Sequence, residues 1–286
     1  LEVGKDGDVA LFNGHPFDAF SRCEMTIIDG EVYFQRRPLV DGKFVARPGD
    51  HSRLPQAAQT PKLDFTPQPK HAYPLVGGTL HPVSGPAVPE GVLAIVDGKI
   101  VAVGPAGTPV PPEAQTIDVH GLDVWPGLID AGTSVGLAEI GSLNETLDFA
   151  DVRRFQPDLL ASTALRADSA HVAVTRANGV LAGLVEPSGG TISGQAAIAN
   201  FNGWAPREMA VVDPAALSVN IPRHIHRPLD SQPRQSGPGG DNGDPNSRRK
   251  ESLEALKQQF LKARRYGEVV AEARSRRLPA PKRDAR

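Results

Sequence analysis

Two apolar runs in the sequence end in a carboxylate, and a carboxylate at the end of a strand can take part in acid–base chemistry. The first lies in residues 124 to 137, VWPGLIDAGTSVGL, and ends at Asp130. The second covers Val180 to Val185 and is followed by Glu186. In α/β proteins the carboxyl ends of neighbouring strands meet at one edge of the sheet. We therefore expect Asp130 and Glu186 at one site.

Two carboxylates at one site could divide the acid and base roles of a proton-transfer reaction between them. The alternative is structural, with Asp130 capping a turn by accepting backbone N–H bonds and Glu186 serving as a surface group at a strand end. The sequence leaves both interpretations open. Further polar side chains that could line the mouth of the site are Thr133, Ser134, Glu139, Ser188 and Gln195.

Histidine and cysteine, common in catalytic and metal sites, are absent from residues 124 to 137. Cys23 is the only cysteine, which excludes an internal disulfide and a multi-cysteine zinc site, and its apolar surroundings predict a buried, unreactive thiol. His224 and His226 have a spacing that places two rings on one face of a strand, so metal ligation and a simple loop are the alternatives there. The other histidines are expected in loops, in packing or facing solvent: His15, His51, His71, His81, His120 and His171.

Composition limits the classes of partner. The chain has 286 residues, 40% of them hydrophobic, which is enough for one or two domains with a sizeable core. The 31 Lys and Arg nearly balance the 33 Asp and Glu, and no apolar run approaches the roughly 18 residues of a membrane helix. We therefore expect a soluble protein, of unassigned compartment, without nucleic-acid or membrane partners.

The elements that must position the site begin with two β-rich blocks. We expect a hairpin in each block, with its turn at Asp29-Gly30 in the first and at Asp97-Gly98 in the second. An Asp-Gly pair favours this turn because Gly accepts the positive φ of a type I′ turn. Both blocks predict pieces of one β-sandwich. Residues 47–70, rich in Pro and Gln, are expected to be a linker.

From residue 124 the pattern changes to strands alternating with helices, which predicts a parallel α/β architecture. We expect one strand over Val124 to Asp130, a helix over Ala161 to Ala177 that stops at Asn178-Gly179, and short strands near Ile192, Ala196 to Ala199 and Met209 to Val212. Residues 228–250 offer almost no apolar side chains and predict an unstructured insertion. A packed, amphipathic helix is expected over Ser252 to Ala273.

The runs VLAIVDGKIVAVGP and TIDVHGLDVWPGLIDA resemble the start of metal-dependent amidohydrolases of the imidazolonepropionase-like group. The resemblance covers about residues 72 to 220 and implies a β-sandwich followed by the first part of a (β/α)8 barrel. Residues 1–46 resemble the end of a member of the same family. The resemblance thus implies an internal piece of a tandem protein: 1–46 from a preceding unit, 71–123 the sandwich strands of a second unit, and 124–286 the first part of its barrel.

The resemblance also identifies which histidines are missing just after Asp130. The family motif, Pro-Gly-Leu-Ile-Asp-Ala-His-x-His, aligns on Pro126 to Ala131 and puts Gly132 and Ser134 at the two positions of metal-binding histidines. Glycine has no donor atom and a serine hydroxyl is a poor zinc ligand. We therefore predict no metal or other cofactor from these residues, while zinc or another divalent metal is compatible with the full-length protein.

Three functions follow as hypotheses. The first is a hydrolase of small molecules acting on non-peptide carbon–nitrogen bonds, with an altered or lost metal site in the second unit. The second is an inactive barrel that packs intramolecularly against the preceding unit, regulates it or binds a ligand. The third, an extracellular polymer-binding module, is disfavoured because an aromatic content of 5% offers no stacking platform.

Overall fold

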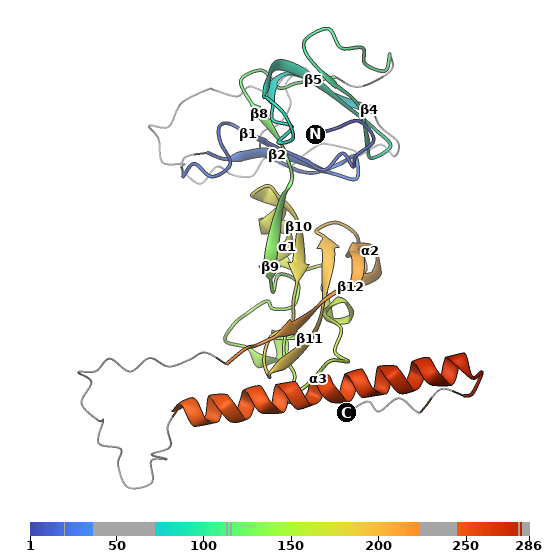
Figure 1. The fold of residues 1–286 in the computed structure, drawn as a ribbon. Helices are drawn as coiled ribbons and strands as arrows, with labels where there is room; N and C mark the ends of the chain where they lie inside the picture. Colours follow the sequence, from blue (N-terminus) through green and yellow to red (C-terminus); the bar gives the residue numbers. More distant parts are fainter. Residues whose placement is uncertain are drawn as a thin grey trace.

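The structure is a computed structural model that describes residues 1–19, 21–36, 72–112, 114, 116–222, 245–279 and 281. In them the chain forms an eight-stranded sheet, a four-stranded sheet and a long C-terminal helix (Figure 1). The expected linker at 47–70 and the pair His224 and His226 lie outside the described residues.

The eight-stranded sheet combines the two β-rich blocks of the sequence. Its strand order is β3-β2-β1-β8-β4-β5-β6, and β7 pairs with β4. The strand β1 of the first block pairs antiparallel with β8 of the second, so the blocks are joined by main-chain hydrogen bonds. The strands are β1 (Val9–Phe12), β2 (Cys23–Ile28), β3 (Glu31–Gln35), β4 (Ala72–Leu80), β5 (Val88–Val96), β6 (Lys99–Gly104), β7 (Ile117–Asp118) and β8 (Asp123–Pro126).

Both predicted hairpins form, and their turns touch. Asp29 and Gly30 have φ values of 51° and 79°, and Asp97 and Gly98 have 48° and 74°, as a type I′ turn requires. A Cβ atom on Gly30 would lie 2.7 Å from the amide nitrogen of Gly98. The two hairpins at opposite edges of the sheet therefore meet, which means that the sheet folds over on itself.

One apolar core lies inside this folded sheet and takes side chains from both blocks. Leu11, Met25 and Ile27 come from the first block, and Leu93 and Ile95 from the second; each is at most 1% exposed. Hydrogen bonding runs through one continuous sheet, whereas the sequence predicts two stacked sheets. The two blocks nevertheless share one core, because neither has enough apolar surface to enclose a core alone.

The stretch predicted as one central strand, Val124 to Asp130, is divided between the two sheets. Its first half belongs to β8 in the eight-stranded sheet, and β9 (Leu128–Thr133) lies at an edge of the four-stranded sheet. Gly127 joins them: its N–H donates to the carbonyl of Asp8 at 3.0 Å, and a Cβ there would lie 2.4 Å from Leu181. The expectation of one strand was wrong because a continuous apolar run does not show which sheet each residue joins.

The four-stranded sheet has the order β12-β11-β10-β9 and is not closed into a barrel. Only β9 and β10 (Val180–Val185) are parallel; β11 (Ile192–Asn200) and β12 (Ala210–Val219) continue antiparallel. The parallel architecture expected beyond residue 185 is therefore wrong. A parallel crossover needs a dozen or more residues, and the connections after β10 and β11 are shorter than that.

The predicted helix over 161–177 is broken in the middle. A 3₁₀ turn, η2 (Ala161–Ala164), is separated from α1 (Ala170–Ala177), and the Arg166 N–H donates to the carbonyl of Gly136 instead of continuing a helix. The backbone of Leu165 is extended, which breaks the helical run. The expected stop is confirmed, since α1 ends before Asn178 and Gly179 has φ of 83°. Two short elements, η1 (Asn144–Thr146) and α2 (Pro206–Met209), complete this region.

The long helix α3 (Pro245–Ser275) begins seven residues earlier than Ser252, so residues 245–250 of the expected unstructured insertion are helical. Near the start of the helix, Nε of Arg249 donates to the carbonyl of Pro222 at 3.1 Å. The helix is only partly packed, because Leu256 is 8% exposed whereas Phe260 is 48% exposed. None of the helices in the described ranges combines the length and apolar content that crossing a bilayer requires.

Candidate functional site

The parallel strands β9 and β10 bring the two predicted carboxylates to the same sheet edge. Thr133 lies opposite Val185, and the Glu186 N–H donates to the carbonyl of Thr133 at 2.9 Å. Asp130 lies opposite Gly183, so a step of three residues along β9 corresponds to a step of two residues along β10 between these two pairs. The chain thus reaches the carboxyl ends of both strands at the point where the sequence predicts the site.

Asp130 and Glu186 start from opposite faces of the sheet. A Cβ on Gly183 would meet the Asp130 Cβ at 3.5 Å, the Thr133 methyl at 3.1 Å and the Phe201 ring at 3.0 Å, on the face that α1 covers. The pairing register shifts between Gly183 and Val185, so Gly132 lies in a bulge of β9. A Cβ on Gly132 would point to the opposite face, where Glu186 lies. The Asp130 carboxylate also accepts the Gly132 N–H at 3.2 Å, which is the turn contact of the structural alternative.

Glu186 and Gly132 face each other on the open side of the sheet. A Cβ on Gly132 would lie 2.9 Å from Oε1 of Glu186, so the carboxylate occupies the space that a side chain at position 132 would need. The other carboxylate oxygen accepts from the Ser218 hydroxyl at 3.4 Å. A carboxylate beside a hydroxyl, at the ends of two parallel strands, can accept and return a proton.

The neighbouring residues shape the loop that follows β9. The Thr133 hydroxyl accepts the Val135 N–H at 3.2 Å, and the Ser134 carbonyl accepts the Leu137 N–H at 2.9 Å. These contacts form the turn at the mouth. Ser134 therefore has a structural role through its main chain.

Of the three remaining predicted residues, Ser188 and Glu139 lie in loops, whereas Gln195 lies in β11. The Ser188 N–H donates to the Phe149 carbonyl at 2.7 Å, and the Glu139 carbonyl accepts from Nε2 of His171 at 2.7 Å. One Glu139 carboxylate oxygen, Oε1, is buried without a hydrogen-bond partner. The Gln195 amide donates to the carbonyl of Pro157 at 2.6 Å, in a wall that contacts α3.

The donor atoms at the mouth do not fit a metal site of the family type. Gly132 offers no side chain, and its space is taken by the Glu186 carboxylate. Over the ranges that the structure describes, no group of three or more His, Cys, Asp or Glu side chains is placed to hold a metal ion. A zinc site needs three or four such ligands.

A cluster that the sequence analysis missed lies in the eight-stranded sheet. His81 Nε2 is 2.6 Å from the Asp123 carboxylate, and the His81 ring stacks on Trp125 with centroids 3.9 Å apart. His15 meets the same indole edge-on at 5.1 Å. These residues come from three distant segments, so no local sequence pattern could have joined them.

Cys23 behaves as its apolar surroundings predict. It is 2% exposed, and burial raises the pKa of its thiol to about 12. At neutral pH the thiolate, which is the nucleophilic form, is therefore scarce. The prediction of an unreactive cysteine is consistent with this environment.

Comparison with known proteins supports a fold relationship. The chain matches no protein-family model and no curated protein. It is similar to the crystal structure of an amidohydrolase from Thermotoga maritima MSB8, with a TM-score of 0.61 and 19% sequence identity. The similarity covers 74% of this chain and 53% of that chain, so this chain corresponds to about half of that protein's length. At this identity the similarity concerns the fold alone.

Proposed function

We propose that the chain is part of an amidohydrolase-type hydrolase that acts on carbon–nitrogen bonds other than peptide bonds in a small-molecule substrate. The observation that carries the proposal is the Glu186 carboxylate, which lies at the ends of β9 and β10 and occupies the space beside Gly132. The fold similarity to an amidohydrolase supports the same class. Neither nucleic acid nor a membrane is part of the proposal.

In the proposed reaction Glu186 is the proton carrier. Its carboxylate takes a proton from a water molecule that attacks the amide or amidine carbon, and then gives that proton to the departing nitrogen. The Ser218 hydroxyl orients the carboxylate through its 3.4 Å contact. Asp130, bound to the Gly132 N–H, holds the turn in shape. A divalent metal, which would polarise the carbon–oxygen bond in such enzymes, belongs to the proposal only for a longer protein whose other residues supply its ligands.

A second candidate is a catalytically inactive unit with a structural, regulatory or ligand-binding role. The same contact favours it, because the carboxylate fills the space beside Gly132 that a metal-binding side chain would occupy. In this proposal the opening block, residues 1–46, belongs to a preceding amidohydrolase unit and packs intramolecularly on the second. The antiparallel pairing of β1 with β8 supports such packing.

Hydrolysis assays on the 286-residue chain test the first candidate. We expect slow, saturable opening of cyclic amides or cyclic amidines from a substrate panel, followed by chromatography. The Glu186→Gln variant should lower kcat/KM by about 10²–10⁴, the range of a lost general base.

The matched control is Glu145→Gln, an exposed glutamate of η1 in the following loop, which should retain activity. Turnover that is equal in the Glu186 and Glu145 variants would remove Glu186 from the mechanism. Absence of turnover across the panel, with and without added zinc, would favour the inactive unit.

A further inference from the structure

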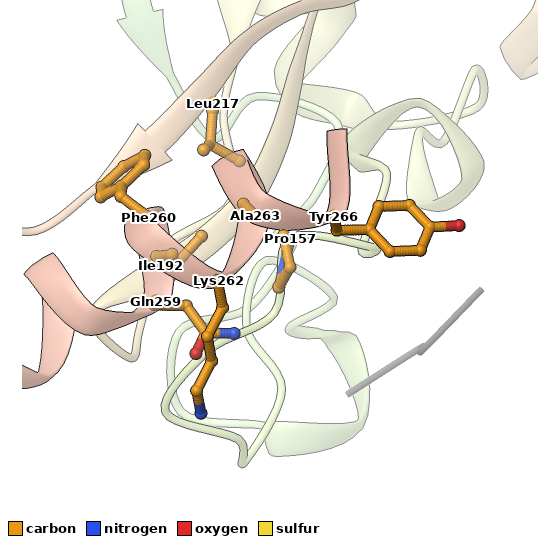
Figure 2. Close-up of a pocket in the computed structure, with 8 residues that line it drawn as sticks. All are labelled: Pro157, Ile192, Leu217, Gln259, Phe260, Lys262, Ala263 and Tyr266. Atoms are coloured by element: carbon orange, nitrogen blue, oxygen red, sulfur yellow. The ribbon is translucent and has the colours of Figure 1, made fainter. Parts of the chain in front are cut away.

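A pocket of about 410 Å³ lies between α3 and the strands β11 and β12 (Figure 2). Small-molecule sites in proteins occupy roughly 300–1,000 Å³. The walls are mostly apolar and include Ile192, Leu217, Phe260, Pro157 and Ala263. Phe260 and Leu217 are 48% and 40% exposed, so a ligand in the pocket would cover apolar surface that is now in water.

This pocket is separate from the site proposed above. Leu217 and Ser218 are successive residues of β12, and successive side chains of a strand point to opposite faces of its sheet. Ser218 contacts Glu186, whereas Leu217 lines the pocket. The two sites therefore lie on opposite faces, and the inference does not depend on the proposed hydrolase activity.

Hydrogen bonds hold the wall of the pocket that lies on the side of the sheet. The Gln195 amide donates to the Pro157 carbonyl at 2.6 Å, and the Gln195 N–H donates to the Leu159 carbonyl at 2.7 Å. Gly194 allows this close approach, because it has φ of 134° and a Cβ there would lie 2.8 Å from the same Leu159 oxygen. The segment 157–159 is thus held against β11 as a preformed wall.

Polar groups gather at one side of the pocket. Figure 2 shows the Gln259 amide and the Lys262 ammonium extending together, away from Phe260 and Leu217. In the described part of α3, Lys257 pairs with Glu254 and Arg264 pairs with Glu268, and Glu272 pairs with Arg276 just beyond the end of the helix. Lys262 is not among them. Its charge is available to an anionic ligand.

We propose that this pocket binds a small amphipathic carboxylate. The apolar chain lies against Ile192, Leu217 and Phe260, and the carboxylate accepts hydrogen bonds from Lys262 and Gln259. One ammonium and one amide match a monoanionic head group, and the apolar walls match a hydrocarbon chain.

Competition binding on the full chain tests the chemical class. A dansyl-labelled undecanoic acid serves as the fluorescent probe, and dodecanoate, dodecanol and dodecylammonium compete for it. We expect saturable binding, with dodecanoate the strongest competitor. Equal competition by dodecanol, or the absence of saturable binding, would overturn the proposal.

Two variants on α3 separate a specific head-group contact from general charge. Lys262→Ala should weaken dodecanoate binding about two- to fivefold, as expected for a solvent-exposed ion pair, and leave dodecanol unchanged. Arg265→Ala removes the same charge from an exposed position that does not line the pocket and should have no effect. Equal losses in both variants would mean that the helix attracts anions without a defined site.

A third variant tests the location. Ala263→Phe places a ring in the pocket from an exposed helix position, so it should preserve folding while reducing dodecanoate affinity at least tenfold. Unchanged affinity would overturn the assignment to this pocket. The last experiment measures binding of the chain to vesicles of anionic phospholipid. If the chain binds them, and the Lys262 and Arg265 variants lose the same amount of affinity, the ligand is a membrane surface and the proposal fails.

Discussion

The two sheets of the molecule differ in how completely they bury their apolar faces. In the eight-stranded sheet, strands from both blocks close over one core, where Leu11 and Leu93 are 0% exposed. In the four-stranded sheet, α1 and η2 cover one face, while Ile129, Ile198 and Val212 on the other are 72%, 36% and 44% exposed. Ile198 is opposite Val212 on β12, so these side chains share one face.

Because of this difference, the sheet that contributes most to the stability of the fold is not the sheet that carries the proposed site. The eight-stranded sheet, folded over its core, concentrates apolar burial, which is the main source of folding free energy. The open face of the other sheet carries Glu186 and Ser218, the groups of the proposed site, within reach of small molecules. The region that contributes less burial is therefore the region in which the proposed site is accessible.

The sharpest test of the comparison is to shorten one apolar side chain in each sheet. Leu11→Ala should lower the free energy of unfolding by about 2–5 kcal/mol, because it leaves a cavity in a closed core. Ile129→Ala, on the open face, should change it by no more than about 0.5 kcal/mol. Urea denaturation of both variants measures the difference. Similar losses would show that the face around Ile129 is covered in solution.

The contact between the two hairpin turns is the next test, since it joins the two edges of the folded eight-stranded sheet. Gly30→Ala should cost about 1–3 kcal/mol, because a Cβ would collide with the Gly98 backbone and a positive φ strains any other residue. Gly85→Ala is the control, as a Cβ there meets nothing within 4 Å. Thermal unfolding compares the two. Equal melting temperatures would mean that the turns do not touch.

The smallest expected effect concerns the junction between the two regions. Arg176 of α1 lies over the Tyr33 ring of β3 at 4.9 Å and donates to the Phe201 carbonyl at 2.8 Å, and burial lowers the pKa of its guanidinium. A double-mutant cycle with Arg176→Met and Tyr33→Leu should give a coupling of about 0.5–2 kcal/mol.

The control cycle uses Arg154 and Phe155, a similar pair at 5.3 Å that lies within one region. Loss of the Arg176 pair should separate the unfolding of the two sheets, whereas loss of the Arg154 pair should not. A single transition in the Arg176→Met variant, with no measurable coupling to Tyr33, would contradict the role of this contact.

Local patterns predicted several elements well. Asp29-Gly30 and Asp97-Gly98 identify their hairpins because the turn conformation depends on the two residues themselves. Val180 to Val185 and the stop at Gly179 also form as predicted. The failures, at Gly127 and at Arg166, are positions where a distant partner decides the backbone conformation.

The candidate site shows the same division. The sequence identified Glu186 and Asp130 as strand-end carboxylates, but the bulge at Gly132, which separates their faces, depends on the register between β9 and β10. Gln195 was expected at the mouth and instead supports Pro157 beside α3. Register and packing involve residues far apart in the chain, so a pattern within one segment does not contain them.

The turns, the alternation of apolar and polar positions, and the lack of histidine at positions 132 and 134 follow from local sequence. Three features depend on contacts across the fold: two β blocks share one core, the chain changes sheets at Gly127, and the Glu186 carboxylate takes the space beside Gly132. The reason is the separation in sequence between the interacting residues. Turn and strand preferences arise between neighbouring residues, whereas cores, sheet edges and sites form from contacts between distant segments.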